Sequence, residues 1–342
     1  MPTTAAATAS ATAGDVHERD WDGVRLHVVT GKGGTGKTTV AAALALALAE
    51  RGKRVLLTEV EERQGIAQLF DVPQPGYDEV RIANGLDGGE VFALAVDPKA
   101  ALLEYLQMFY KLGRAGGLLE RFGAIDFATT IAPGVRDVLL TGKVYEAVRR
   151  RSGGRPVYDA VVLDAPATGR ITRFLDVNSE VAGLARVGPI RHQADSITTL
   201  LRSPQTAVHL VTLLEEMPVQ ETLDGVASLR AVGLPVGGVV VNQVREPILP
   251  AGRLASAAKG KVNRAEIGRG LQAAGLGHAE SDVDVLVTEA TEHAQRVLLE
   301  QRERQEIDAL ARPVYELPAR SELVDVGTLY RLAELLREQG MA

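Results

Sequence analysis

A glycine-rich segment near the start of the chain carries the residues best suited to binding phosphate. It runs Gly31-Lys32-Gly33-Gly34-Thr35-Gly36-Lys37-Thr38-Thr39, and residues 31–38 fit the pattern G-x-x-x-x-G-K-[ST]. Glycine lets backbone N–H groups come close to phosphate oxygens. A helix that starts directly after the loop adds the positive end of its dipole. The segment therefore predicts a phosphate-binding loop.

The side chains of this loop indicate a nucleoside triphosphate as the ligand. We expect Lys37 to reach the β- and γ-phosphates of ATP, or the β-phosphate of the product ADP, and the hydroxyl of Thr38 to bind Mg²⁺. Further contacts to ATP would come from Gly33, Gly34, Thr35, Gly36 and Thr39. A glycine-rich turn without a ligand is the alternative. The ligand site is favoured because the loop lies between an apolar strand pattern and an apolar helix pattern.

A second residue for Mg²⁺ should stand at the end of a neighbouring strand. Asp164 directly follows the apolar run 158–163, which reads YDAVVL, and fits this role. Since Pro166 and Gly169 follow within five residues, Asp164 could instead cap the N-terminus of a helix. We predict that Asp164 holds Mg²⁺ together with Thr38.

Short apolar runs alternate with helical patterns along most of the chain. The expected strands are residues 24–29, 53–60, 91–96, 158–163, 207–213 and 236–242. Such strands, separated by helices, predict an α/β fold with a mostly parallel sheet covered by helices on both faces. Two stretches interrupt the alternation, at about 98–150 and 246–285, and are interpreted as helical insertions. We expect a single domain over residues 22–342 after a disordered tail at 1–21.

Composition excludes several classes of protein. The 342 residues carry a net charge of −6, which argues against nucleic acid as a partner because binding to it needs a basic face. The longest apolar run, residues 40–49, is about half of what a membrane-spanning helix requires. We therefore expect a soluble, cytoplasmic protein with no integral membrane segment.

The second lysine of the loop, Lys32, narrows the class. The run Lys-Gly-Gly-Thr-Gly-Lys-Thr resembles the deviant phosphate loop of ParA, MinD and the arsenite-pump ATPase ArsA. The resemblance implies that Lys32 reaches across a dimer interface to the nucleotide of the partner. Alone, Lys32 could be a solvated loop residue.

The segment 164–175, DAPATGRITRFL, selects one branch of this class. It resembles the second switch of the ArsA and tail-anchored-protein-targeting ATPases, D-T-A-P-T-G-H-T-x-R-x-L, which ParA and MinD proteins lack. Five residues match it at identical spacing: Asp164, Thr168, Gly169, Arg173 and Leu175. The chain is most similar to the actinobacterial proteins known as anion-transporting ATPases, and the resemblance spans about residues 22–340.

The resemblance extends to the expected base-binding residues. Asn242, at the end of a strand pattern, matches the asparagine that contacts adenine in this family. Leu317-Pro318 resembles the loop that covers the base. Residues 214–217 and Glu221-Thr222 lie where the family has an I-P-E-x…E-T element.

The first switch departs from the family pattern D-P-A-x-N. Its aspartate, which positions the attacking water, aligns with Glu61 here, and the longer side chain implies altered geometry and slow hydrolysis. Glu59 and Glu62 are neighbours that could take this role instead. A surface cluster of charge, paired with Arg63, is the alternative. We expect Lys32, Lys37 and Glu61 to be the catalytic residues.

The chain contains no cysteine, which removes two features of the relatives. Arsenite-stimulated ATPases bind metalloid through thiolates, and the targeting ATPases join their dimer through zinc held by C-x-x-C. We therefore expect neither metalloid nor zinc here. The six histidines are scattered through the sequence without metal-ligand spacing.

What ATP would drive is the least determined point. Six aromatic residues fall between positions 105 and 145: Tyr105, Phe109, Tyr110, Phe122, Phe127 and Tyr145. The corresponding region of the targeting ATPases forms a groove for hydrophobic client helices, but ordinary packing is favoured here because methionine is scarce.

We expect a nucleotide-switched dimer, formed with an identical chain or with a paralogous ATPase. A nucleotide-stabilised scaffold with negligible turnover is the alternative. A positioning ATPase of the ParA or MinD type, which would bind DNA or anionic lipid, is a third hypothesis. Neither the net charge of the chain nor its C-terminal segment supports it.

Overall fold

Eight strands form the central sheet, in a computed structural model that describes residues 20–60, 65–110, 133–184, 189–276, 280–320 and 324–342. In chain order the sheet strands are β1 (Leu26–Gly31), β2 (Arg54–Glu59), β3 (Val80–Asn84), β4 (Glu90–Ala95), β7 (Ala160–Asp164), β8 (Thr206–Thr212), β9 (Val236–Val244) and β10 (Val314–Pro318). They lie in the spatial order β10-β9-β8-β1-β7-β2-β4-β3. Every neighbouring pair is parallel except β3 with β4. A separate short hairpin joins β5 (Arg151–Ser152) to β6 (Arg155–Pro156).

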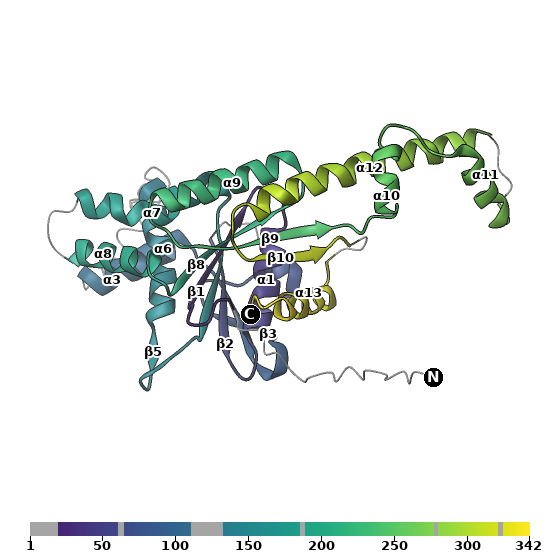
Figure 1. Ribbon diagram of the computed structural model, residues 1–342. Coiled ribbons are helices and arrows are strands. Elements are labelled where there is room, and N and C mark those ends of the chain that lie inside the picture. Colours follow the sequence, from purple (N-terminus) through teal and green to yellow (C-terminus); the bar gives the residue numbers. More distant parts are fainter. Residues whose placement is uncertain (1–19, 61–64, 111–132, 185–188, 277–279, 321–323) are drawn as a thin grey trace, which may run out of the picture.

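Helices connect these strands and cover the sheet (Figure 1). Their bounds are α1 (Lys37–Leu48), α2 (Gly65–Phe70), α3 (Pro98–Tyr110), α6 (Pro133–Arg149), α7 (Thr168–Leu184), α8 (Pro189–Leu201), α9 (Glu216–Ala231), α10 (Ala251–Ala257), α11 (Arg264–Ala273), α12 (Glu280–Asp308) and α13 (Val326–Glu338), with a 3₁₀ turn at Leu86–Gly88.

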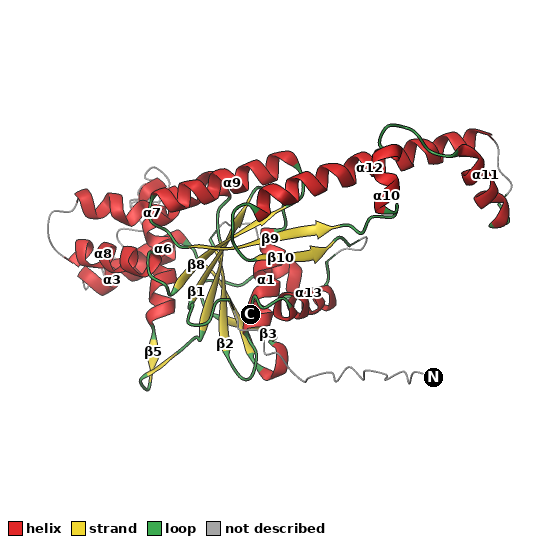
Figure 2. Cartoon of the chain, viewed as in Figure 1, coloured by secondary structure: helices red, strands yellow, loops and turns green. Residues whose placement is uncertain are grey.

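Helices cover both faces of the sheet (Figure 2), and an apolar layer lies between the helices and each face. On one face α1, α2 and α13 pack on side chains such as Val29 and Leu57. On the other face α6, α7, α8 and α9 pack on the alternate side chains, such as Val28 and Leu56. Strand residues point alternately to the two faces, so strands buried on both sides need near-continuous apolar sequence. This confirms the predicted α/β fold.

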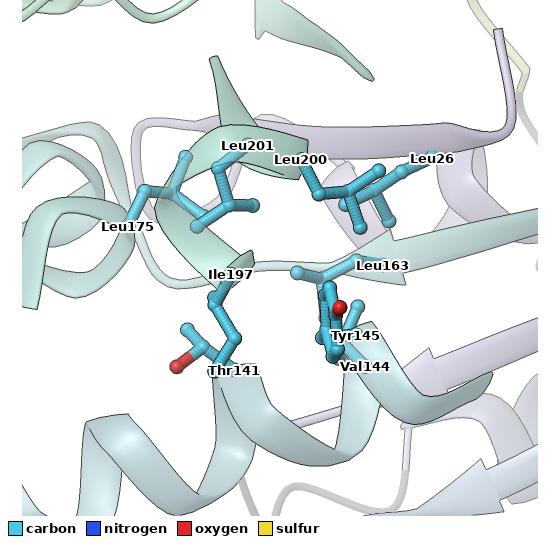
Figure 3. A pocket seen from close by; sticks show the side chains of 9 residues that line it. All are labelled: Leu26, Thr141, Val144, Tyr145, Leu163, Leu175, Ile197, Leu200 and Leu201. Atoms are coloured by element: carbon cyan, nitrogen blue, oxygen red, sulfur yellow. The ribbon is translucent and has the colours of Figure 1, made fainter. Parts of the chain in front are cut away.

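The second apolar layer contains one small cavity where α6, α7 and α8 meet the sheet (Figure 3). It has a volume of about 10 Å³, and mostly aliphatic side chains of nine residues line it. Thr141 brings a hydroxyl, which donates to backbone carbonyls of its own helix. A space of this size holds one water molecule at most. It is a packing defect rather than a ligand site.

The stretch 246–285 forms α10, α11 and the start of α12, which extend beyond the sheet as an arm (Figure 1). Leu254 and Ala257 of α10 pack on Ala294 and Val297 of α12, in a cluster separate from the two main layers. No residue of α11 is buried. The predicted short helices of this stretch are therefore present.

The stretch 98–150 contains α3 and α6 among its described residues, in agreement with the helical pattern. Between these helices, residues 111–132 lie outside the described part of the chain. At the start of the chain, Asp20 and Trp21 were assigned to the tail, but both contact the folded core. Trp21 donates a hydrogen bond to the Tyr315 hydroxyl, which donates to Asp20.

Candidate functional site

The glycine-rich loop connects β1 to α1 at the carboxyl end of the central strands. Gly36 precedes the helix with φ of 89°, a left-handed conformation that favours glycine. A Cβ atom on Gly36 would lie 2.3 Å from Nδ2 of Asn242, so any side chain would displace that amide. The first N–H groups of α1 have no partner within the helix and face the loop side.

The backbone carbonyl oxygen of Lys32 is contacted by several groups of the loop. Thr35 donates to it from its hydroxyl at 2.9 Å and from its backbone N–H at 3.3 Å. The Lys37 ammonium lies 3.4 Å from the same oxygen. Lys37 is 8% exposed, so its charge is held inside the loop. The Lys37 side chain thus meets the backbone of Lys32 within one loop.

Thr38 and Asp164 come together beside this loop. The Thr38 hydroxyl donates to Oδ2 of Asp164 at 2.6 Å, although 126 residues separate the two in the chain. Asp164 is the last residue of β7, and β1 pairs with that strand so that Val29 is the partner of Asp164. Strand pairing therefore places the carboxylate next to the first turn of α1.

These two side chains fit Mg²⁺. They present a hydroxyl and a carboxylate oxygen, the hard donors that Mg²⁺ prefers, next to a predicted phosphate site. The described residues contain no group of three or more His, Asp or Glu side chains arranged to hold a metal. A Mg²⁺ site needs none, because this ion takes one or two protein ligands and completes its shell with phosphate and water.

A second acidic residue, Glu59, lies at the same edge. It ends β2 and is the register partner of Asp164, so both side chains point to one face of the sheet. Glu59 is 7% exposed, and its Oε1 accepts a hydrogen bond from the Gly65 N–H at 3.1 Å. This contact brings the start of α2 against Thr38, since a Cβ on Gly65 would lie 2.9 Å from Thr38 Cγ2. Glu61 and Glu62 fall outside the described residues.

Asn242 lies beside the loop rather than apart from it. Its side-chain NH₂ donates to the Thr35 carbonyl at 2.9 Å, and its Oδ1 accepts from the Gln243 N–H at 3.0 Å. The amide thus braces the phosphate loop from β9. Contact with adenine stays a prediction. The bracing contact was missed by sequence reasoning, which could not place the end of β9 against the loop.

Leu317 and Pro318 end β10, where a loop over the base was expected. Leu317 is fully buried in the layer with α1 and α13, whereas Pro318 is exposed. Of this pair, only Pro318 stands where solvent or a ligand reaches it. A role in covering the base stays a prediction.

A carboxylate of α9 joins the phosphate loop to the predicted second switch. Glu221 Oε1 lies 3.0 Å from the Lys32 ammonium, and Glu221 Oε2 accepts a hydrogen bond from the Thr168 hydroxyl at 3.2 Å. Thr168 starts α7, directly after the Asp164 segment. The Thr30 hydroxyl also donates to the Pro166 carbonyl at 2.7 Å. Besides the Thr38–Asp164 hydrogen bond, Glu221 thus links the phosphate loop to the Asp164 segment, and Thr30 ties β1 to the same segment.

Two histidines that are far apart in sequence form a buried pair between β1 and β8. His27 Nδ1 lies 3.1 Å from His209 Nε2, and the rings stack. The Gly238 N–H donates to His209 Nδ1. Because that nitrogen accepts, the other nitrogen of a neutral His209 carries the proton and donates to His27. Burial lowers the pKa of His27 from 6.5 to about 4, and burial followed by the His27 charge lowers the pKa of His209 well below its usual value.

The expected client region is described only in part. Residues 111–132, with Phe122 and Phe127, lie outside the described part of the chain, as do the side chains of Tyr105, Phe109 and Tyr110. Tyr145 packs, partly buried, against the second apolar layer. Among the described helices, none is long and apolar enough to cross a membrane.

Comparison with known proteins gives a consistent result. The sequence pattern of the anion-transporting ATPases matches residues 24–202. The ATPase BagA of Mycobacterium tuberculosis is 54% identical over 320 residues, which cover 93% of this chain and 94% of that protein. An arsenical pump-driving ATPase of Acidiphilium multivorum is 26% identical over 230 residues, 63% of this chain and 38% of that protein. The ATPase get3 of Pyrenophora tritici-repentis is 27% identical over 210 residues, 57% of this chain and 58% of that protein.

Proposed function

Since the chain belongs to the family of anion-transporting ATPases and is an ATPase of that class, we propose that Mg²⁺-dependent binding and slow hydrolysis of ATP open and close a dimer. The observation that carries this proposal is the Thr38–Asp164 hydrogen bond of 2.6 Å beside a loop with two lysines. It brings the predicted metal oxygens and the predicted phosphate site together.

Different residues are proposed to bind the phosphates, Mg²⁺ and adenine. Backbone N–H groups of residues 33–39 surround the phosphates at the N-terminus of α1, and Lys37 exchanges the Lys32 carbonyl for phosphate oxygens. Thr38 and Asp164 hold Mg²⁺, which neutralises charge on the phosphates when bound. Asn242 keeps the loop in shape through the Thr35 carbonyl and contributes to adenine binding.

Hydrolysis transfers the γ-phosphoryl group to water. A water oxygen forms a bond to the γ-phosphorus, the bond from that phosphorus to the β–γ bridging oxygen breaks, and ADP and phosphate leave. The water needs a carboxylate to orient it. Glu61 is the proposed residue, and the buried Glu59 stands close by on the described part of the same segment. A glutamate places its carboxylate one methylene further out than aspartate, which supports slow turnover.

The dimer is proposed from Lys32. In the single chain the Lys32 side chain is 30% exposed, and its ammonium pairs with Glu221 of α9. On leaving this pair, the ammonium would reach a second nucleotide site, in an identical chain or a paralogous ATPase. The γ-phosphate then supplies contacts that differ between the open and closed states, as a switch requires.

A nucleotide-stabilised scaffold with negligible turnover is the second candidate. The glutamate in place of the first-switch aspartate favours it, because binding uses the loop while hydrolysis needs the water to be aligned. Absence of cysteine keeps metalloid and zinc out of either version. A hydrophobic protein client held by the 98–150 helices remains compatible with both.

Three variants test the proposal. Lys37→Ala should lose most ATP binding, because the charge on the β- and γ-phosphates has no substitute. Asp164→Asn should lower Mg²⁺ affinity at least 10- to 100-fold, the loss seen for second-shell changes alone. Lys32→Ala should bind ATP as a single chain yet lose turnover. Lys259→Ala, which changes an exposed lysine beyond α10, is the matched control.

The measurements are ATP affinity by calorimetry and phosphate release at steady state. Wild-type turnover in Lys32→Ala would overturn the role of this lysine at a partner's nucleotide. Phosphate release below detection in the wild-type chain, with ATP bound and at every chain concentration, would favour the scaffold.

A further inference from the structure

One carboxylate on α9 contacts both the first lysine of the phosphate loop and the segment after Asp164. Glu221 gives Oε1 to the Lys32 ammonium at 3.0 Å and Oε2 to the Thr168 hydroxyl at 3.2 Å. Side-chain exposure is 30% for Lys32 and 36% for Glu221, so the pair lies at the rim of the site, partly shielded from water.

Hydrogen bonds fix the main chain of Lys32, whereas its long side chain is held through the ammonium group at its tip. Its carbonyl accepts from Thr35 and Lys37, which keeps the backbone in the closed loop. Four rotatable bonds separate that backbone from the ammonium. The ion pair with Glu221 is the contact that sets where the ammonium lies.

Glu221 cannot follow the lysine if it moves. Its helix is packed closely on the sheet and on α7, because a Cβ on Gly225 would lie 3.1 Å from Leu210 Cδ2 and 3.3 Å from Thr168 Cγ2. Thr222, the next residue, is 1% exposed. The backbone that carries Glu221 is therefore anchored to its own subunit. A movement of Lys32 toward another chain that exceeds the reach of the Glu221 side chain must break the pair.

We propose that Glu221 is a positioning residue that holds Lys32 within its own chain, and that this contact must be released before Lys32 can serve the nucleotide of a second copy. The need for release before Lys32 serves a second copy rests on the proposed function, whereas the hold of Glu221 on Lys32 does not. Release of the lysine leaves the hydrogen bond between Glu221 and Thr168 in place, so α9 stays linked to α7. Glu221 thus opposes dimer closure until bound nucleotide in the other chain attracts the lysine more strongly.

The first test examines the contact in the single, nucleotide-free chain. Acetylation by acetic anhydride, followed by mass spectrometry of Lys32 relative to Lys259, measures how readily each amine reacts. We expect Glu221→Gln to raise the relative rate at Lys32 by about two- to fivefold, the range of a partly exposed ion pair. Asp224→Asn, with the same charge change on an exposed position of the same helix, should leave it unchanged.

The second test measures self-association by sedimentation with Mg²⁺ and a nonhydrolysable ATP analogue. Glu221→Gln should dimerise at a chain concentration about two- to fivefold lower than wild type, and Asp224→Asn at the wild-type concentration. An unchanged acetylation rate in Glu221→Gln overturns the inference, as does faster acetylation without easier association. If the wild-type chain binds the analogue but does not associate, the proposed dimer fails, whereas the acetylation result still decides whether Glu221 holds Lys32.

Discussion

Asn242 supports the phosphate loop at two neighbouring residues. Its NH₂ group donates to the Thr35 carbonyl, and its Cγ and Nδ2 fill the space that a Cβ on Gly36 would need. The asparagine therefore supports the phosphate loop whether or not a base is bound. Contact with adenine, if it occurs, is an additional role and can be separated experimentally.

We predict that Asn242→Ala weakens the binding of inorganic tripolyphosphate as well as ATP. Loss of a buried hydrogen bond that braces the loop costs about 1 kcal/mol, which is about a fivefold loss in tripolyphosphate affinity. ATP affinity should fall by a larger factor, because the adenine contact is lost too. Calorimetry with both ligands measures this. Unchanged tripolyphosphate affinity would show that the brace has no energetic effect, and equal losses would argue against adenine contact.

The phosphate loop itself could be predicted because all of its residues are adjacent in sequence. Asp164 could be predicted because an acidic residue after an apolar strand has a known place in a parallel sheet. The Lys32–Glu221 contact could not, since it depends on how α9 lies relative to β1, and 189 residues separate the two. Glu221 was recognised only as part of a family motif.

At the scale of elements, the strands that form the centre of the sheet were predicted by their continuous apolar sequence. β3 and β10 were not, and both lie at the edges of the sheet. An edge strand is covered less completely, so it tolerates polar residues such as Arg81 and Glu316 and loses the apolar signal. The sequence pattern also did not predict α12 as one continuous helix. This helix passes from the arm to the core, and its buried residues lie on different faces in the two parts.

The pairing of β1 with β8 carries the buried histidines, and from it we predict a dependence of stability on pH. The unfolded pKa of His27 is about 6.5, and burial lowers the folded value to about 4. Between these values the unfolded chain binds a proton that the folded chain excludes. The contribution of His27 to the free energy of unfolding should therefore be fully retained above about pH 6.5 and fall by about 3 kcal/mol as the pH drops to about 4. His209, whose pKa is also lowered by burial, adds a loss in the same direction.

Urea unfolding at several pH values measures this effect. His27→Asn keeps an acceptor for His209 but cannot titrate, so its stability should fall less steeply than wild type between pH 6.5 and 4. His192→Asn removes an exposed histidine and should follow the wild-type slope. Parallel slopes for wild type and His27→Asn would show that other groups cause the acid loss.

At the scale of the whole molecule, the ATP site and the arm have separate apolar clusters. The site is built on the two layers around the sheet, whereas the arm depends on contacts between α10 and α12. Leu254 is 3% exposed in the arm cluster and Leu44 is fully buried in the layer beneath the phosphate loop. The two leucines therefore offer matched substitutions in different parts of one chain.

We predict that Leu254→Ala loosens the arm without changing the ATP site. Truncating a buried leucine costs about 2–5 kcal/mol, enough to open a small local cluster while the core stays folded. Hydrogen exchange should accelerate in α10, α11 and the first half of α12, with ATP affinity and the main unfolding transition unchanged. Leu44→Ala should lower the main transition and weaken ATP binding, because α1 begins with Lys37 and Thr38. If Leu254→Ala lowers the main transition as much as Leu44→Ala does, the arm and the core unfold as one cooperative unit, and a signal bound at the arm would have a direct energetic route to the nucleotide.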